Sequence, residues 1–210
     1  MTPAFVVFEG PEGGGKTTQV ARLAARLRAQ GYEVVETREP GGTRVGNEIR
    51  AILLGLGEDY AILPETEVLL LAAARAQHVR EVIQPALARN AWVLCDRYAD
   101  STYAYQGGGR GLDLAPLRDI QEFATNGLMP DLRLLLDVPV EIGLKRRHAD
   151  PASVNRIDLA DLSFHERVRS AFLALAADSP DHWLVIDARR DPDAVEALIW
   201  EQLPRKLATE

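Results

Sequence analysis

The sequence has little of what defines several large protein classes. Cys95 is its one cysteine, so no disulfide can form within the chain, and the apolar residues around it predict a buried thiol in a reducing compartment. The longest apolar run, residues 68–74, has seven residues, whereas a membrane-spanning helix needs about 20. The N-terminus lacks the basic segment that begins a secretory signal. We therefore expect a cytoplasmic protein with no membrane partner.

Basic residues are fewer than acidic ones, 24 against 31. The formal net charge is -7 at pH 7, which argues against a nucleic-acid partner, because such proteins present a basic excess to phosphate. Only three of the 24 basic residues are lysines, Lys16, Lys145 and Lys206, so a lysine in a candidate site is more informative than an arginine. Any anion must be bound at a local cluster of basic residues.

The hydrophobic pattern predicts an α/β protein, with residues 1–210 forming one domain. Short apolar runs predict five buried strands, at residues 5–8, 32–35, 92–95, 132–136 and 183–186. Apolar spacing of three and four residues predicts helices at 17–30, 65–88, 114–125, 140–147, 163–177 and 192–203. This alternation is typical of a parallel sheet with helices on both faces. We expect residues 38–46 and 106–111 to be loops that border a ligand site.

Residues 10–17, Gly-Pro-Glu-Gly-Gly-Gly-Lys-Thr, match the phosphate-binding pattern G-x-x-x-x-G-K-[ST] between a predicted strand and a predicted helix. The glycines allow backbone N–H groups to turn toward phosphate oxygens, and the helix N-terminus adds its dipole. We expect Lys16 to reach the β- and γ-phosphates of a nucleotide and Thr17 to bind Mg²⁺. The expected phosphate-binding residues are Gly10, Glu12, Gly13, Gly14, Gly15, Lys16, Thr17 and Thr18.

A carboxylate that acts with Mg²⁺ is expected at the end of a second strand, and Asp96 and Asp137 both meet that condition. Arg97 follows Asp96 and could clamp a transferring phosphoryl group, whereas residues 138–139 after Asp137 are Val-Pro. We favour Asp96, and Asp137 remains the alternative. No Asn-Lys-x-Asp sequence occurs, which argues against a GTP-dependent switch.

Several further segments resemble the thymidylate kinase family, in the family's order and over nearly the whole chain. These are Phe-Glu-Gly at 8–10, Arg-Glu-Pro-Gly-Gly-Thr at 38–43, Ala-Ala-Arg-Ala-Gln-His at 73–78, Asp-Arg-Tyr at 96–98, Ser-Thr at 101–102, Ala-Tyr-Gln-Gly at 104–107 and Leu-Asp-Val-Pro at 136–139. The resemblance implies an enzyme with the P-loop kinase fold that transfers the γ-phosphoryl group of ATP to dTMP with Mg²⁺, and a homodimer.

The resemblance also implies roles for individual residues around dTMP. Arg38, Arg75 and Arg97 would hold the dTMP phosphate, Thr102 and Gln106 would meet thymine, Tyr105 would pack near the deoxyribose, and Glu12 would face its 3′-hydroxyl. Leu71 occupies the position where the family usually has a phenylalanine stacked on thymine. Because leucine lacks the ring, we expect weaker or broader base selection.

A lid is expected at about residues 146–157, where breakers and small residues follow a predicted helix. Its candidate arginines are Arg146, Arg147 and Arg156, which the sequence ranks only weakly. The expected catalytic set is Lys16, Asp96, Arg97 and Arg147. By the resemblance, the loop at 187–191 would place Arg189 beside the adenine of ATP.

Two alternatives remain open from the sequence. The first is a kinase of the same fold that acts on another nucleotide or on a deoxynucleoside, which the substitution at Leu71 allows. The second is a nucleotide-binding module that has lost catalysis, although Lys16, Thr17, Asp96 and Arg97 are all chemically competent.

Overall fold

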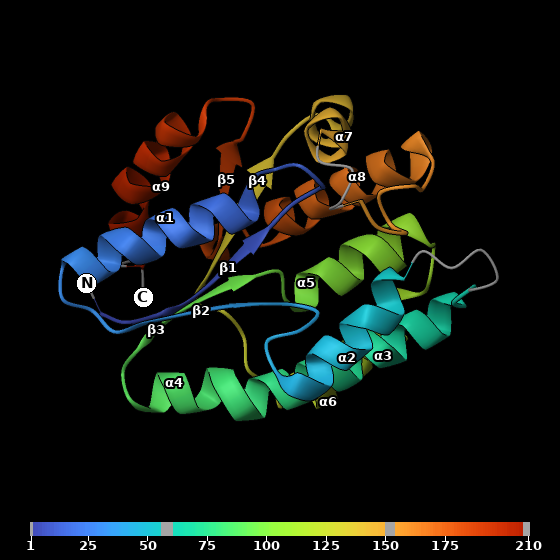
Figure 1. Cartoon of the computed structure of the whole chain (residues 1–210), viewed down its shortest axis with the longest axis horizontal. Coiled ribbons are helices and arrows are strands. Elements are labelled where there is room, and N and C mark those ends of the chain that lie inside the picture. The colour runs from blue at the N-terminus through green and yellow to red at the C-terminus, as the bar shows by residue number, and fades with distance from the viewer. Residues whose placement is uncertain (1, 56–60, 150–153, 208–210) are drawn as a thin grey trace.

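The computed structural model describes residues 2–55, 61–149 and 154–207. Five parallel strands form one sheet in the order β2-β3-β1-β4-β5 (Figure 1). The predicted five-stranded α/β fold is confirmed. The strands are β1 (Phe5–Glu9), β2 (Val34–Arg38), β3 (Trp92–Asp96), β4 (Leu132–Asp137) and β5 (Trp183–Asp187).

Alternate residues of each central strand pack against helices on opposite faces of the sheet. Val6 and Phe8 of β1 face α1 (Lys16–Ala29) and α9 (Pro192–Leu207), whereas Phe5 and Val7 face the helix that ends in α4 (Gln84–Ala88). On the β4–β5 side, α8 (Leu162–Asp178) covers the second face. A strand that is buried on both faces is apolar throughout, which is why these strands were visible in the sequence.

Strand β2 differs from its prediction by about two residues. It runs over Val34–Arg38 at the edge of the sheet, where Glu36 and Arg38 are exposed. An edge strand alternates buried and exposed residues, so the apolar run at 32–35 covers only its beginning.

The segment at 38–46 was predicted to be a loop throughout, but α2 (Arg44–Leu54) begins within it. Thr43 caps this helix, because its hydroxyl accepts a hydrogen bond from the N–H of Gly46 at 2.9 Å. Because glycines precede the helix, the spacing of apolar residues does not show where it begins.

The prediction of a loop at 106–111 is wrong for residues 106–109. After α5 (Ala99–Thr102), residues Tyr103–Gly109 form a π-helical segment. Its glycines serve close packing, since a Cβ on Gly108 would lie 2.6 Å from Cβ of Ala171, and one on Gly109 would lie 2.5 Å from the ring of Phe164. The glycine run therefore marks a tight helix contact.

The remaining helices lie near their predicted positions. Residues predicted as one helix at 65–88 form α3 (Pro64–His78), a π-helical turn (Val79–Ile83) and α4, with Pro85 accommodated just after the turn. The others are α6 (Leu114–Thr125), α7 (Val140–His148), α8 and α9. Cys95 is a free thiol with no exposed surface, as predicted. Among the described residues, no helix combines the length and apolar character needed to cross a membrane.

Candidate active site

The phosphate loop connects β1 to α1 at the carboxyl edge of the sheet. Gly10, Gly13 and Gly15 have φ values of 134°, 69° and 83°, which side chains rarely adopt. Gly13 is further constrained, because a Cβ there would lie 2.0 Å from the carbonyl oxygen of Gly143 in α7. The loop therefore needs glycine for its turn and for the approach of α7.

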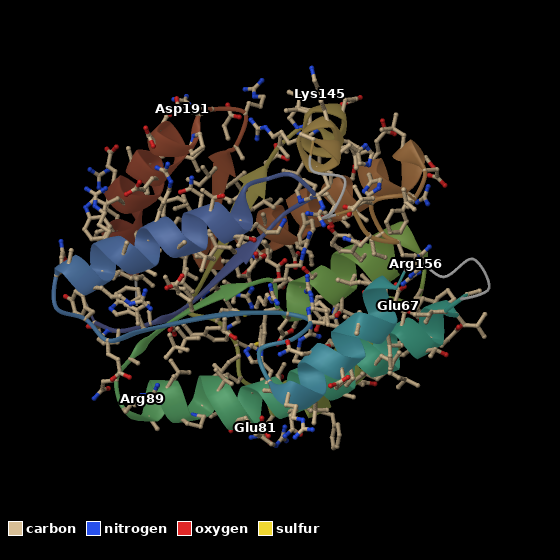
Figure 2. All side chains as sticks on the ribbon, viewed as in Figure 1. Glu67, Glu81, Arg89, Lys145, Arg156 and Asp191 are labelled. Atoms are coloured by element: carbon tan, nitrogen blue, oxygen red, sulfur yellow. The ribbon has the colours of Figure 1, made fainter. Side chains whose placement is uncertain are left out.

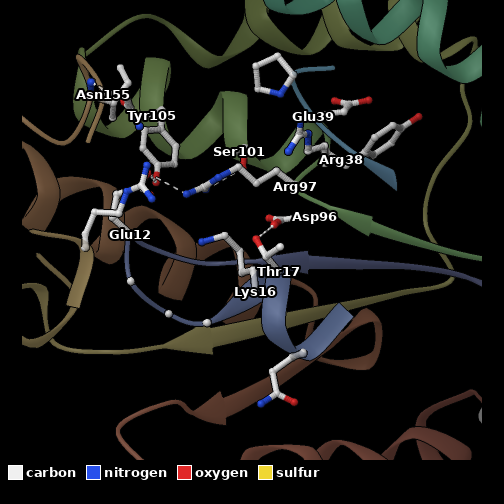
Figure 3. A pocket seen from close by; sticks show the side chains of 18 of the residues that line it. Glu12, Lys16, Thr17, Arg38, Glu39, Asp96, Arg97, Ser101, Tyr105 and Asn155 are labelled. Atoms are coloured by element: carbon white, nitrogen blue, oxygen red, sulfur yellow. Dashed lines mark hydrogen bonds and ion pairs between the residues drawn. The ribbon is translucent and has the colours of Figure 1, made fainter. Parts of the chain in front are cut away.

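Lys16, the first residue of α1, folds back over this loop (Figure 3). Its Nζ donates hydrogen bonds to the carbonyl oxygens of Gly10 at 3.0 Å and Pro11 at 2.8 Å. Burial, and then the charge of Arg97, lower the pKa of Lys16 to about 8, although Glu12 opposes the shift. The ammonium group is thus held in place before any phosphate arrives.

Thr17 and Asp96 lie together beside Lys16, as Figure 3 shows. The Thr17 hydroxyl donates to Oδ2 of Asp96 at 2.5 Å. A hydroxyl and a carboxylate are the hard oxygen ligands that Mg²⁺ prefers, and substrate phosphates usually complete its shell. Asp137 instead forms a bidentate pair with Arg169, at 2.7 and 2.8 Å. The donor set fits Mg²⁺ at Asp96 better than at Asp137.

Arg97 extends from the end of β3 between the phosphate loop and the π-helical segment. One Nη donates to the carbonyl oxygen of Gly10 at 3.0 Å, and the other donates to Glu12 at 2.9 Å. The guanidinium also lies 4.8 Å from the centre of the Tyr105 ring. Its φ of 73° is left-handed, a conformation that costs a non-glycine residue about 1–2 kcal/mol. Strain of this kind is characteristic of functional positions.

Glu12 is held between Arg97 and Tyr105. The Tyr105 hydroxyl donates to Oε1 of Glu12 at 2.8 Å. Burial alone would raise the pKa of the Glu12 carboxyl, but the charges of Arg97 and Lys16 outweigh burial and lower it to about 2. Glu12 is therefore an ionised hydrogen-bond acceptor at the centre of the site.

Glu9, at the end of β1, is a fully buried carboxylate that supports Arg97. It accepts hydrogen bonds from the backbone N–H groups of Tyr98 (2.9 Å) and Ser101 (3.2 Å), and from the Ser101 hydroxyl (2.6 Å). That hydroxyl in turn accepts from Arg97 at 3.3 Å. Burial, and secondly the charge of Asp100, raise the pKa of Glu9 to about 7.

Replacing Glu9 by glutamine should change how stability depends on pH. Between about pH 4.5 and 7 the folded protein binds more protons at Glu9 than the unfolded chain does. The stability from this group is therefore complete below the lower value and is lost as the pH rises through the higher one. The free energy of unfolding of the wild type relative to Glu9→Gln should fall by the order of 1–3 kcal/mol across this range.

Urea unfolding at several pH values from about 5 to 8 measures this difference. Glu33→Gln is the matched control, because Glu33 is 55% exposed and pairs with Arg89 at the surface. Parallel stability profiles for the wild type and Glu9→Gln would contradict the assignment.

One cavity of about 820 Å³ joins the phosphate loop to a second group of predicted residues. This second group comes from β2, α3, the residue directly after β3, α5 and the π-helical segment. It comprises Arg38, Leu71, Arg75, Arg97, Thr102, Tyr105 and Gln106. All residues predicted to meet dTMP therefore line the same cavity as the phosphate loop. Its volume is typical of a small-molecule site.

The predicted phosphate-binding arginines have different surroundings within this cavity. The side chain of Arg38 is exposed and forms no hydrogen bond or ion pair with the described residues. Arg75 is only 2% exposed and donates to Glu39 at 2.7 Å, to Thr102 at 3.1 Å and to the Tyr98 carbonyl at 2.9 Å. Arg38 is thus available to an anion, whereas the guanidinium of Arg75 is already hydrogen-bonded to neighbouring protein groups.

The three candidate lid arginines contact different parts of the structure. Arg146 donates to the carbonyl oxygens of Ala188 (2.8 Å) and Arg189 (3.1 Å). Arg147 pairs with buried Asp158 at 3.0 Å and contributes to the low pKa of Glu12. Arg156 pairs with Glu67 on α3. Residues 150–153 of the predicted lid lie outside the described residues.

Arg189 lines the opposite end of the cavity, after β5. It forms a bidentate pair with Asp187, both distances being 2.8 Å, and its side chain is 62% exposed. The loop that carries Arg189 therefore lies beside the phosphate loop and is exposed to solvent, as expected for a loop that borders a nucleotide base.

Sequence reasoning missed several cavity residues. Glu39 accepts from Arg75 and contacts Nδ1 of His78 at 2.9 Å, and Arg50 donates to the Pro40 carbonyl at 2.9 Å. Glu67, which also lines the cavity, was not in the predicted site, and neither was Glu9, which supports Arg97 without lining the cavity. The family motifs at 8–10 and 38–43 contain Glu9 and Glu39, but the resemblance gave neither glutamate a role.

Three features lie at the carboxyl edge of this parallel sheet: a phosphate loop with its lysine, a Thr–Asp pair and a neighbouring pocket lined by arginines. Together they define a P-loop kinase. The sequence profile of thymidylate kinase matches residues 8–199. The chain belongs to the thymidylate kinase family.

Individual relatives agree with this placement. The chain is 56% identical to a thymidylate kinase of Thermomicrobium roseum over 196 residues, covering 93% of this chain and 92% of that protein. It is 50% identical to one from Pseudomonas fluorescens strain SBW25 over 207 residues, covering 99% and 98%. The crystal structure of thymidylate kinase from Ehrlichia chaffeensis superimposes with a TM-score of 0.79 at 30% identity, covering 97% of this chain and all of that one.

Proposed function

We propose that this enzyme transfers the γ-phosphoryl group of ATP to dTMP, which yields dTDP and ADP. The observation that carries the proposal is the shared cavity in which Arg97 lies between the phosphate loop and the residues expected to meet dTMP. Donor and acceptor phosphates bound there would meet at this guanidinium. The relatives named thymidylate kinase support the same acceptor.

The reaction needs positioning and charge stabilisation rather than a covalent enzyme intermediate. An oxygen of the dTMP phosphate forms a bond to the γ-phosphorus while the bond to the bridging oxygen of ATP breaks, and ADP keeps that electron pair. Lys16 and Arg97 stabilise the charge on the moving group, and Arg147 joins them from the lid. The acceptor phosphate is itself an adequate nucleophile, so no strong base is required.

Thr17 and Asp96 would hold the magnesium ion. When bound, the ion supplies positive charge to the β- and γ-phosphate oxygens. Two observations support this assignment. The Thr17 hydroxyl lies 2.5 Å from Oδ2 of Asp96. The phosphate loop also brings Thr17 to the N-terminal turn of α1, where anions bind.

The acceptor would lie across the cavity from the phosphate loop. Arg38 and Arg97 hold its phosphate, with Arg75 fixing the surrounding network, and Glu12 accepts a hydrogen bond from the sugar 3′-hydroxyl. Tyr105 limits the space beside the deoxyribose. Leu71 and Thr102 contact the base, and Arg189 edges the adenine of ATP.

A Leu71→Phe variant should bind dTMP more tightly. Leu71 is half-buried in the cavity, and a ring stacked on the base gains about 0.5–1.5 kcal/mol beyond area burial, or about two- to tenfold in Kd. Isothermal titration with dTMP and dUMP measures both affinities. Unchanged affinities for both nucleotides would mean that Leu71 does not contact the base.

We also propose that the enzyme is a cytoplasmic homodimer. Leu69 on α3 is 60% exposed and Phe123 on α6 is 82% exposed, and large apolar side chains on adjacent helices are typical of an interface. A Phe123→Glu variant should shift sedimentation toward the monomer, because it would bury a charge. An unchanged sedimentation coefficient would exclude α6 from the interface.

Acceptor profiling tests the proposed function. ADP formation from Mg-ATP should be fastest with dTMP among dTMP, dUMP, dGMP, CMP, AMP and thymidine, and EDTA should abolish it. Faster transfer to another acceptor would retain the kinase and overturn the substrate. ATP binding without transfer to any acceptor would favour a binding module.

A further inference from the structure

The two ends of the Gln106 side-chain amide have different surroundings. Nε2 donates a hydrogen bond to Oε1 of Glu67 at 2.6 Å. The amide oxygen is buried, yet it has no hydrogen-bond partner among residues 2–55, 61–149 and 154–207. Gln106 is 3% exposed and lines the cavity with Leu71 and Thr102. A buried acceptor left without a donor is costly, so this oxygen marks a place where a ligand N–H belongs.

Glu67 is held as an acceptor by its other oxygen. Oε2 pairs with a guanidinium nitrogen of Arg156, which Figure 2 shows beside it, and lies 3.5 Å from one of Arg110. The side chain is 3% exposed and lies in the first turn of α3, where a negative charge is favourable. An ionised carboxylate accepts hydrogen bonds and donates none.

This pairing dictates which way the Gln106 amide points. If the amide were rotated by half a turn, its oxygen would face Oε1 of Glu67, and two acceptors would oppose each other at hydrogen-bond distance. The NH₂ group therefore stays on Glu67, and the free oxygen stays on the other side.

We propose that Glu67 is a positioning residue that fixes the Gln106 amide, so that its free oxygen selects a base with an N–H on its pairing edge. This inference rests on the proposed function. Thymine and uracil carry a proton on N3, whereas N3 of cytosine is an acceptor and would face the amide oxygen unfavourably. Glu67 thus favours dTMP and dUMP over dCMP without touching the base.

The test is the ratio of kcat/KM for dTMP to that for dCMP in a Glu67→Gln variant. Glutamine at this position can offer either an oxygen or an NH₂ group, so the Gln106 amide can rotate. The ratio should fall about tenfold or more, whereas the ratio for dTMP to dUMP should be unchanged because both bases carry the N3 proton. Arg110→Gln is the matched control, since it removes a neighbour of Oε2 and leaves the bond to Gln106.

The outcomes separate this inference from the proposed function. If the wild type transfers phosphate to none of these acceptors, the proposed function is wrong. If the wild type prefers dTMP and the variant loses activity on dTMP and dCMP equally, Glu67 has only a structural role and the inference is wrong.

A measurement on the wild type covers the case in which Glu67→Gln does not fold. In an amide proton–nitrogen spectrum, the Gln106 side-chain proton on Glu67 should resonate downfield and exchange slowly, and dTMP should leave it there. If both side-chain amide protons of Gln106 instead have the chemical shifts and fast exchange of a solvent-exposed amide, the proposal is wrong.

Discussion

Replacing Arg97 by glutamine should lower kcat by about 10³-fold, the scale of losing an arginine that stabilises phosphoryl transfer. Among the described residues, Arg97 is the one whose guanidinium contacts three groups of the site. These are the carbonyl of Gly10 in the phosphate loop, the Glu12 carboxylate and the face of the Tyr105 ring. Burial opposes its charge, but Tyr105 and Glu12 raise the pKa of Arg97 overall, so it is a permanent cation. Steady-state kinetics with ATP and dTMP measure the loss.

Two further variants control this experiment. Arg97→Lys retains a charge but cannot donate in the planar fork that binds two oxygens, so it should recover only part of kcat. Arg22→Gln removes an arginine whose partners, Asp193 and Glu196, are at the surface, and should keep kcat within about twofold. A folded Arg97→Gln protein with nearly normal kcat would remove Arg97 from the mechanism.

Replacing Lys16 by methionine should lower kcat by about 10²- to 10³-fold, the effect of losing one preorganised donor to developing charge. Its ammonium group is already fixed on Gly10 and Pro11 carbonyls, so little reorganisation is needed when ATP binds. Because the interaction strengthens as charge develops, kcat should fall more than the affinity for ATP.

Lys145→Met is the matched control, since Lys145 is exposed on α7 and points away from the molecule (Figure 2). Rapid-quench kinetics and fluorescent-nucleotide binding separate the effects on transfer and on affinity. A Lys16→Met variant that binds ATP and turns over at the wild-type rate would exclude Lys16 from charge stabilisation.

The parts of the site that the sequence predicted depend on local patterns. Gly13 and Lys16 belong to one short loop whose conformation and chemistry are encoded by neighbouring residues, and Asp96 ends a strand that is buried on both faces. Parallel strands bring such ends to one edge of the sheet, so the site followed from the fold.

The parts that were missed depend on contacts distant in sequence. Glu9 meets Ser101, and Glu67 meets Gln106, across 92 and 39 positions of the chain. Glutamate is usually exposed, and the residues next to each glutamate do not show which distant side chain it meets. The glycines at 107–109 likewise suggested a loop because their contacts with α6 and α8 are tertiary. These residues position the ones that the motifs identify.

The most direct test of direct transfer between two bound nucleotides is a single turnover with ATP labelled on its γ-phosphate and excess dTMP. The label should appear in the terminal phosphate of dTDP, at the same rate as ADP forms and with none bound to protein. Label released as inorganic phosphate, or retained on the protein before dTDP appears, would contradict the account.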